Sequence, residues 1–155
     1  MGLDIEHKTK LHQFYELIKE LRNEGIVRSD NIFGDIGEYL CTRIYPNLTL
    51  VQSKTNPGYD ATEEGKKIQI KFSDSCDAKN INVGKPDEYD VLIVVLGPKS
   101  AHRYKNDDIS RKDKILFYRF TSLEVKEKFK TENNHYSLSR TKQFKPAEKE
   151  LELWE

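Results

Sequence analysis

The chain has 155 residues, of which 36% are hydrophobic and 34% are charged, and its 26 Lys and Arg residues balance 26 Asp and Glu residues. This composition excludes a disordered chain, and the length allows one domain with its own core but not two ordinary domains. The zero net charge gives no overall attraction to nucleic acid, so any DNA binding must come from local placement of charge. We expect one domain over residues 1–155, with a core at about 29–130 and a polar tail at about 133–155.

Two features indicate a cytoplasmic protein without a membrane partner. No apolar run approaches the roughly 18 residues that span a bilayer, and the first residues lack the hydrophobic centre of a signal peptide. The two cysteines, Cys41 and Cys76, fit neither a disulfide framework nor a CxxC metal site, which suits a reducing compartment.

The first predicted helix covers residues 9–23 and ends at Gly25. Its apolar side chains recur at steps of three and four residues, which places them on one stripe. The stripe consists of Leu11, Phe14, Tyr15, Ile18 and Leu21. We expect this helix to pack on the core through that stripe.

A second helix is predicted between residue 29 and Pro46. Ser29, Asp30 or Asp35 can cap its first turn, because their side-chain oxygens accept hydrogen bonds from backbone N–H groups. The expected buried face comprises Ile36, Leu40 and Ile44. Glu38 lies away from that face.

The hydrophobic period then changes to two. We predict strands at 48–52, 59–63 and 67–73, joined by turns at 56–58 and 64–66. Residues 74–90 contain few apolar side chains and indicate a loop with a helical turn. The third strand alternates apolar with polar side chains, namely Ile68, Ile70 and Phe72 with Gln69, Lys71 and Ser73.

The continuous apolar run at 91–97 predicts the central strand of the sheet, because a strand covered on both faces loses its alternation. Another strand is predicted at 114–120, followed by a helix at 121–130. Thr121 or Ser122 can cap this helix, and Glu124, two or three residues later, fits a capping box. The tail adds a final strand or lies over the surface. This order predicts an α/β fold in which helices flank a mixed central sheet whose first three strands form a meander.

One face of the third strand has residues suited to phosphodiester hydrolysis. That reaction requires charge neutralisation at the phosphate and an activated water, which a divalent metal held by carboxylates supplies, with a lysine nearby. Gln69 and Lys71 lie two apart on a strand and so share a face, and the hairpin closed near 64–65 brings Asp60 across from them. The alternative is that Gln69 and Lys71 form the solvated face of an edge strand.

These residues also resemble a known motif. "YDAT", followed nine residues after its aspartate by "QIK" and preceded by Glu38 in "GDIGEYL", resembles the PD-(D/E)XK nuclease superfamily, and the Gln-x-Lys variant resembles its Mrr-type branch. The resemblance covers roughly residues 29–96. It implies a restriction endonuclease-like core, with the metal aspartate on one arm of a hairpin and the E-x-K or Q-x-K motif on the other.

Carried over by position, the resemblance implies a Mg²⁺ or Mn²⁺ site. Asp60 would be the principal metal ligand, Gln69 would stand in place of a second acidic ligand, Lys71 would be the catalytic lysine, and Glu38 would complete the metal site. Two features depart from the pattern. Pro57 stands three residues before Asp60 instead of next to it. An amide oxygen also binds a hard cation less strongly than a carboxylate, which leaves weakened or lost activity open.

DNA contacts are expected from basic and amide side chains in the loops around the sheet, because Arg and Lys bind phosphates and Asn reads adenine. The candidates are Lys79, Asn80, Asn82, Lys85, Lys99, Arg103, Lys105, Arg140 and Lys142. An equally weighted alternative is that these are ordinary solubility charges. The histidines show no metal-ligand spacing and are expected at the surface, at His7, His12, His102 and His135.

The function expected from these patterns is a metal-dependent DNA endonuclease of restriction type. Cutting both strands of a duplex would require a homodimer. One alternative is a nuclease-fold module with weak or no catalysis that binds DNA or a protein partner. Another is a DNA repair or junction-resolving nuclease, which shares the chemistry and differs in substrate.

Overall fold

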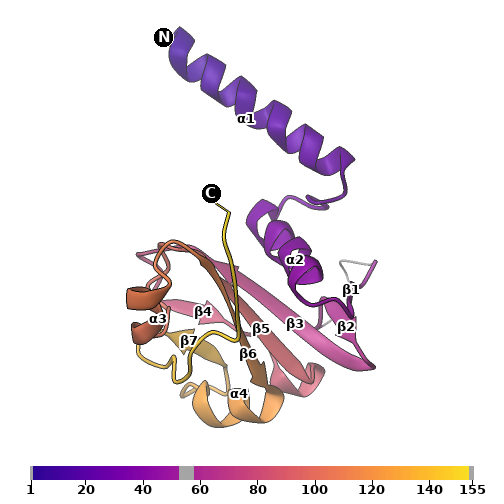
Figure 1. Cartoon of the computed structure of the whole chain (residues 1–155), viewed down its shortest axis with the longest axis vertical. Coiled ribbons are helices and arrows are strands. Elements are labelled where there is room, and N and C mark those ends of the chain that lie inside the picture. Colours follow the sequence, from indigo (N-terminus) through magenta and orange to yellow (C-terminus); the bar gives the residue numbers. More distant parts are fainter. Residues whose placement is uncertain (1, 53–57, 154–155) are drawn as a thin grey trace.

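The fold is of the mixed α/β class, and the computed structural model describes residues 2–52 and 58–153 (Figure 1). Its main sheet has six strands in the spatial order β1 (Leu48–Leu50), β2 (Ala61–Glu63), β3 (Lys66–Ser73), β5 (Val91–Leu96), β6 (Ile115–Thr121) and β8 (Lys149–Leu151). Strands β3 and β5 are parallel, and all other neighbours in this sheet are antiparallel. The predicted mixed sheet and its opening meander are therefore confirmed.

Strand β5 lies in the middle of the sheet, as the apolar run predicted. All six of its residues are buried. Leu92, Val94 and Leu96 belong to the apolar cluster on one face, and Val91, Ile93 and Val95 belong to the cluster on the other. Layers that cover both faces explain why this strand shows no alternation.

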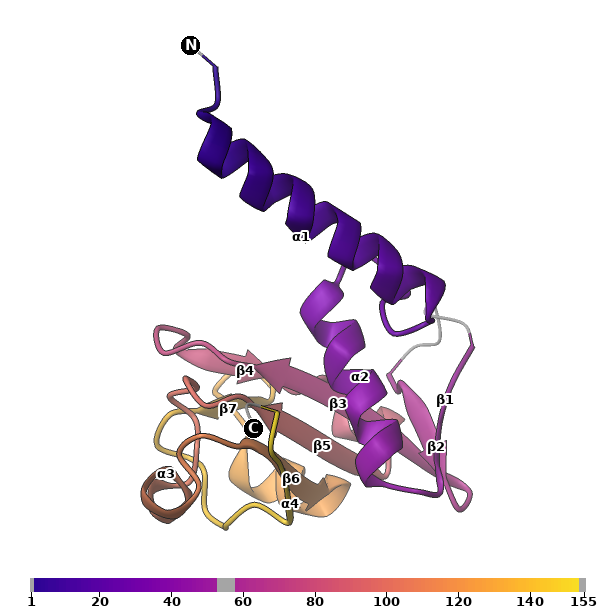
Figure 2. The same ribbon diagram turned by 45° about the horizontal axis from the view of Figure 1, so that its top comes forward.

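Each face of the sheet has its own cover (Figure 2). Helix α2 (Ile32–Ile44) packs on β3 and β1. The opposite face carries helix α4 (Ser122–Lys128) and a small second sheet in which β4 (Asn80–Asn82) pairs with β7 (Ser137–Ser139). The segment 74–90, predicted to be a loop with a helical turn, contains the short 3-10 helix η1 (Pro86–Glu88) and also β4, which was not predicted. Strand β4 has three residues and one apolar side chain, so its hydrophobic period cannot be detected in the sequence.

The first helix runs from an Asp4 cap as α1 (Ile5–Asn23), and the chain turns at Gly25 with φ +75°. It projects away from the sheet instead of covering it (Figures 1 and 2). Within this fully described helix Ile18 alone is buried, whereas Leu11, Phe14 and Tyr15 are 47%, 48% and 68% exposed. The prediction that the stripe packs on the core was wrong, because α2 already covers the sheet face that α1 would need.

The cap and the buried face of α2 also differ from prediction. Asn31 is the N-cap and accepts a hydrogen bond from the Gly34 N–H, whereas the Asp35 carboxylate accepts hydrogen bonds from the Arg28 and Ser29 backbone N–H groups. Asp35 is buried and connects the start of the helix to the preceding loop.

Glu38 lies on the buried face of α2 and not away from it, with 6% of its surface exposed. The same face carries Gly37, where an added Cβ would lie 2.8 Å from the Cβ of Phe72. Of the predicted buried face, Leu40 is buried, and Ile36 and Ile44 are partly buried and pack against the same apolar cluster. Because the backbone of α2 lies so close to Phe72 at Gly37, the helix is oriented with Glu38 and Cys41 facing β3.

The tail forms β7, and its last described segment adds β8 to the edge of the main sheet beside β6. A short helix, α3 (Lys105–Ser110), precedes β6. Pro57 and most of the predicted turn at 56–58 lie outside the described residues. Across residues 2–52 and 58–153, the structure contains no helix long and apolar enough to span a membrane.

The predicted capping box of α4 is present. The Thr121 hydroxyl accepts a hydrogen bond from the Glu124 N–H at 3.1 Å, and the Glu124 carboxylate accepts one from the Thr121 N–H at 3.1 Å. We expect Thr121→Ala to lower the free energy of unfolding by about 1 kcal/mol and Thr121→Ser to lower it much less, as measured by urea denaturation. An equal loss in both variants would show that the cap does not stabilise the helix.

Candidate active site

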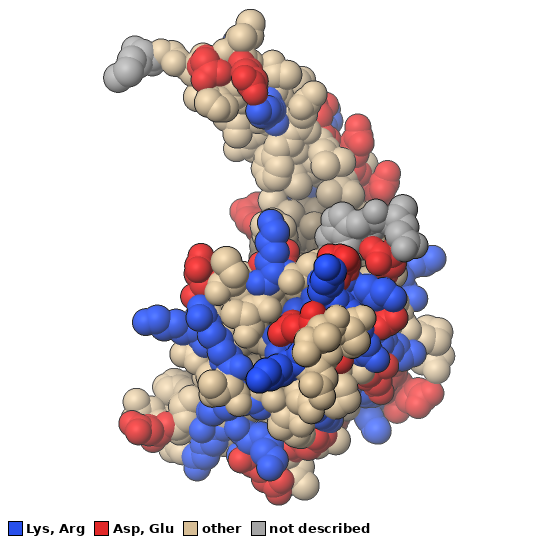
Figure 3. All heavy atoms as spheres, turned by 60° about the vertical axis from the view of Figure 1, so that its left-hand side comes forward, with Lys and Arg blue, Asp and Glu red and all other residues tan. Residues whose placement is uncertain are grey.

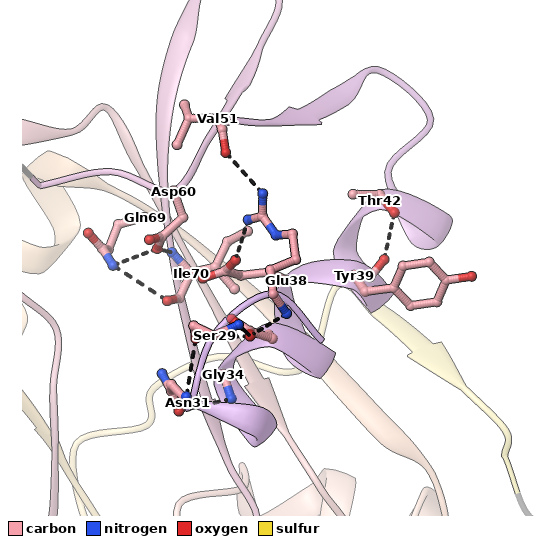
Figure 4. Close-up of polar contacts among 12 residues, drawn as sticks. Ser29, Asn31, Gly34, Glu38, Tyr39, Thr42, Val51, Asp60, Gln69 and Ile70 are labelled. Carbon is pink, nitrogen blue, oxygen red and sulfur yellow. Dashed lines mark hydrogen bonds and ion pairs between the residues drawn. The ribbon is translucent and has the colours of Figure 1, made fainter. Parts of the chain in front are cut away.

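The Asp60 side chain bridges two strands at the start of β2. Its backbone continues the sheet ladder, since its N–H donates to the Ile68 carbonyl at 2.8 Å and its carbonyl accepts from the Val51 N–H at 3.0 Å. Its carboxylate Oδ2 accepts hydrogen bonds from the Gln69 Nε2 at 2.7 Å and the Ile70 N–H at 2.8 Å (Figure 4). Two N–H donors stabilise the ionised form of a carboxylate.

The turn between β2 and β3 produces this register. Glu64 and Gly65 both have positive φ, at 50° and 81°, as a tight hairpin requires. Ala61 then pairs with Ile68, so that Asp60 comes opposite Gln69 as predicted.

Gln69 and Lys71 face the layer of α4 and β4. Their partners on β5 are Leu92 and Val94, which belong to the apolar cluster on that side. Gln69 is 7% exposed, and Lys71 is half-buried. The alternative of a solvated edge strand was wrong, because β3 lies inside the sheet between β2 and β5.

Glu38 approaches from the opposite layer and is held by an arginine. Its carboxylate Oε2 accepts a hydrogen bond from the Arg28 Nη2 at 2.9 Å, and the Arg28 Nη1 donates to the Val51 carbonyl at 3.2 Å (Figure 4). Arg28 therefore links α2 to the end of β1. Sequence reasoning missed this arginine, because it stands in a loop outside any periodic segment.

The pKa of the buried Cys41 thiol is affected by both carboxylates. Burial raises its pKa most, and the negative charges of Glu38 and Asp60 raise it further. Both carboxylates therefore lie near one buried point, with Glu38 coming from the helix and Asp60 from the sheet.

Asp60 and Gln69 are the residues that could supply oxygen ligands to a small magnesium site. Mg²⁺ keeps several waters and needs only one or two protein oxygens, and rotating the Gln69 amide would turn its Oε1 toward Asp60 in place of Nε2. The Oε2 atom of Glu38 is bound to Arg28. Among the described residues, no three His, Cys, Asp or Glu side chains are placed to hold a metal together.

Several predicted DNA contacts lie close to this face. Lys79, Asn80, Asn82 and Lys85 are exposed on and around β4. At Gly84, between two of them, an added Cβ would lie 3.9 Å from the Gln69 Oε1, so this loop borders the Gln69 amide.

The remaining basic candidates are more dispersed. Lys99 and Lys105 are exposed, the Arg140 guanidinium donates to the Ala78 and Cys76 carbonyls, and the Lys142 ammonium donates to the Lys130 carbonyl. Figure 3 brings the side with α3 and β4 forward and shows Lys and Arg spread over it with Asp and Glu among them.

Arg103 is not available for DNA, contrary to the prediction. It is 4% exposed, and its guanidinium donates to the Lys112 carbonyl at 3.2 Å and the Lys114 carbonyl at 3.0 Å, and also to that of Arg111. The predicted surface position of His102 was also wrong, because its ring is fully buried and burial lowers its pKa.

A scan against models of known protein families found no match, and neither did a search of curated protein sequences. The resemblance to PD-(D/E)XK nucleases stays a prediction from the motif. The function is therefore inferred from the geometry around Asp60.

The role of Arg103 is testable by its effect on stability. We expect Arg103→Ala to lower the free energy of unfolding by about 2–4 kcal/mol, since several buried carbonyls lose their donor. Lys99→Ala removes an exposed cation from the same segment between β5 and β6. This change should lower the free energy of unfolding by less than about 0.5 kcal/mol. Chemical denaturation measures both, and equal effects would contradict the structural role.

Proposed function

We propose that this protein is a metal-dependent DNA endonuclease of restriction type. The observation that carries the proposal is the contact between the Asp60 carboxylate and the Gln69 amide, with Lys71 on the same face of the same strand. A carboxylate and an ammonium group on adjacent internal strands are parts that metal-assisted phosphodiester hydrolysis uses, and the Gln69 amide oxygen could serve as a weaker second ligand.

Each residue has a distinct role in this proposal. Asp60 and the Gln69 amide oxygen would hold Mg²⁺ or Mn²⁺, which when bound neutralises charge on the phosphate and lowers the pKa of a coordinated water. The Lys71 ammonium donates to a phosphate oxygen or orients the attacking water. Arg28 keeps Glu38 in place behind Asp60.

The surface around β4 supports duplex DNA as the substrate. Lys79 and Lys85 would neutralise phosphates, and the exposed Asn80 amide could read adenine, whereas the Asn82 amide oxygen accepts a hydrogen bond from the Gly84 N–H. This surface borders Gln69 through Gly84, so DNA bound there would lie against the proposed metal site.

A second candidate is a nuclease-fold module that binds DNA or a protein partner without cutting. It is favoured by the pairing of Glu38 with Arg28 and by Gln69, which brings no negative charge to a metal. A repair or junction-resolving nuclease would share the chemistry of the first proposal and differ in its substrate.

The enzyme proposal predicts the behaviour of four variants. Plasmid and linear duplexes should be cut with Mg²⁺ or Mn²⁺, and Asp60→Asn and Lys71→Ala should each reduce cutting at least about a hundredfold, as loss of one such group does elsewhere. Lys66→Ala, an exposed lysine on the same strand, should cut normally. Gln69→Glu should tighten Mn²⁺ binding in calorimetry, because a carboxylate is the stronger ligand.

Cutting that survives in both Asp60→Asn and Lys71→Ala would overturn the site. Absence of cutting by the native chain, together with DNA binding and no measurable metal binding, would favour the non-catalytic module. Circular dichroism should show the same fold in all variants.

We further propose that the enzyme acts as a homodimer joined through α1. One such site cuts one strand, and a two-fold pair of sites matches the two strands of a duplex. The exposed stripe of α1 provides the surface, with Leu11, Phe14 and Tyr15 about half or more exposed. Antiparallel contact of two α1 helices would bring Asp4 and Glu6 of each copy near Lys19 and Arg22 of the other; Lys8, Lys10, Glu20 and Glu24 lie at the same two ends.

Light scattering tests this contact. The native chain should have the mass of a dimer, whereas Leu11→Glu combined with Phe14→Glu should have that of a monomer and should nick one strand instead of cutting both. Ile109→Glu, at an exposed apolar position on α3, should stay dimeric. A native chain that is monomeric throughout, or a dimer that withstands both charges, would contradict the interface.

A further inference from the structure

A cavity of about 360 Å³ opens between the start of α2 and the end of β3. It is lined by Phe33, Phe72, Ser73, Asp74, Ser75 and Lys99. Ser73 follows Lys71 by two residues along the same strand, a separation of about 7 Å. Phe33 and Phe72 lie on the α2 side of the sheet, so the cavity opens at the end of β3, across the sheet from the face that carries Gln69 and Lys71.

The apolar wall of this cavity is a pair of parallel phenylalanine rings. The rings of Phe33 and Phe72 are within 5° of parallel with centroids 6.2 Å apart. Phe72 is fixed by its close contact with Gly37, whereas Phe33 is 68% exposed. An exposed aromatic ring on a rigid support is suited to stacking with another flat ring.

The opposite wall is polar. The Asp74 carboxylate accepts a hydrogen bond from the Lys99 N–H at 2.7 Å, which fixes it at the rim, and the Lys99 side chain is exposed. The Ser75 hydroxyl accepts hydrogen bonds from the Asp77 and Ala78 N–H groups and holds the loop in shape. The cavity thus combines an aromatic surface, hydrogen-bond acceptors and a cation.

We propose that this cavity binds one unpaired nucleobase of a DNA strand. The base stacks on Phe33, its amino or imino N–H groups donate to Asp74, and its phosphate lies at Lys99. A base within a duplex cannot bind in this way, because its neighbours cover both of its faces. The proposal rests on the proposed function and deepens it: the substrate has a single-stranded or extruded nucleotide.

Binding of a single-stranded oligonucleotide and of the blunt duplex of the same sequence, both in EDTA, tests this subsite without cutting. The single strand has 2-aminopurine at its centre, whose fluorescence changes when it stacks. We expect Phe33→Ala to weaken single-strand binding about tenfold and duplex binding less than twofold, and Phe33→Tyr to retain both. Ile109→Ala, which truncates an equally exposed apolar side chain on α3, should change neither.

Three results would overturn the subsite: no single-strand binding by the native chain, equal loss of both probes in Phe33→Ala, or unchanged 2-aminopurine fluorescence at saturation. Its failure is distinguishable from failure of the proposed function. Cutting that depends on Asp60 and Lys71 but shows no role for Phe33 removes the subsite alone. Stacking at Phe33 in a chain that never cuts removes the nuclease and leaves a single-strand binding site.

Discussion

The parallel pairing of β3 with β5 determines how the rest of the molecule is arranged. Parallel neighbours need a crossover of a dozen or more residues, and here residues 74–90 provide it. That crossover carries β4 over one face of the sheet and leaves the other face to α2. It also makes β3 an internal strand, so the Gln69 side chain is buried beneath a layer of protein and Lys71 is half-buried.

Burial of polar groups in this way is stable only when each has a partner. An ionised carboxylate removed from water loses its hydration, and N–H donors or a cation must replace it. Asp60 receives the Gln69 amide and the Ile70 N–H, and Glu38 receives Arg28. The candidate site is thus a set of satisfied polar contacts, and the same contacts hold β2, β3 and α2 together around it.

The sequence predicted those parts of the fold that depend on a local period. The apolar run of β5, the hairpin from Asp60 to Lys71 and the capping box at Thr121 are short-range patterns, and each was confirmed. The direction of α1, by contrast, depends on which element reaches the sheet first, and an amphipathic stripe does not encode its partner. Arg103 looked like any loop cation, because the carbonyls it binds converge only after folding.

The same limit applies to the candidate site. Spacing on a strand predicted that Asp60, Gln69 and Lys71 share a face, since a strand has a fixed period of two. Spacing could not predict that Glu38 arrives from the opposite layer with Arg28 already bound, because that depends on the rotation of α2, which the contact between Gly37 and Phe72 fixes. Polar partners that are distant in the sequence are therefore determined by how the elements pack and not by the residue pattern within one element.

The electrostatics of this packing explain why an amide suits position 69. Asp60 and Glu38 already place two negative charges near the buried Cys41 thiol, and a third carboxylate at position 69 would face Asp60 directly. Like charges at hydrogen-bond distance cannot both stay ionised without a cation between them. An amide at this position instead donates to Asp60 and keeps the hairpin stable in the absence of metal, at a cost in attraction for a divalent ion. Under the proposed function, the stability of the metal-free fold and the strength of metal binding are therefore opposed at a single side chain.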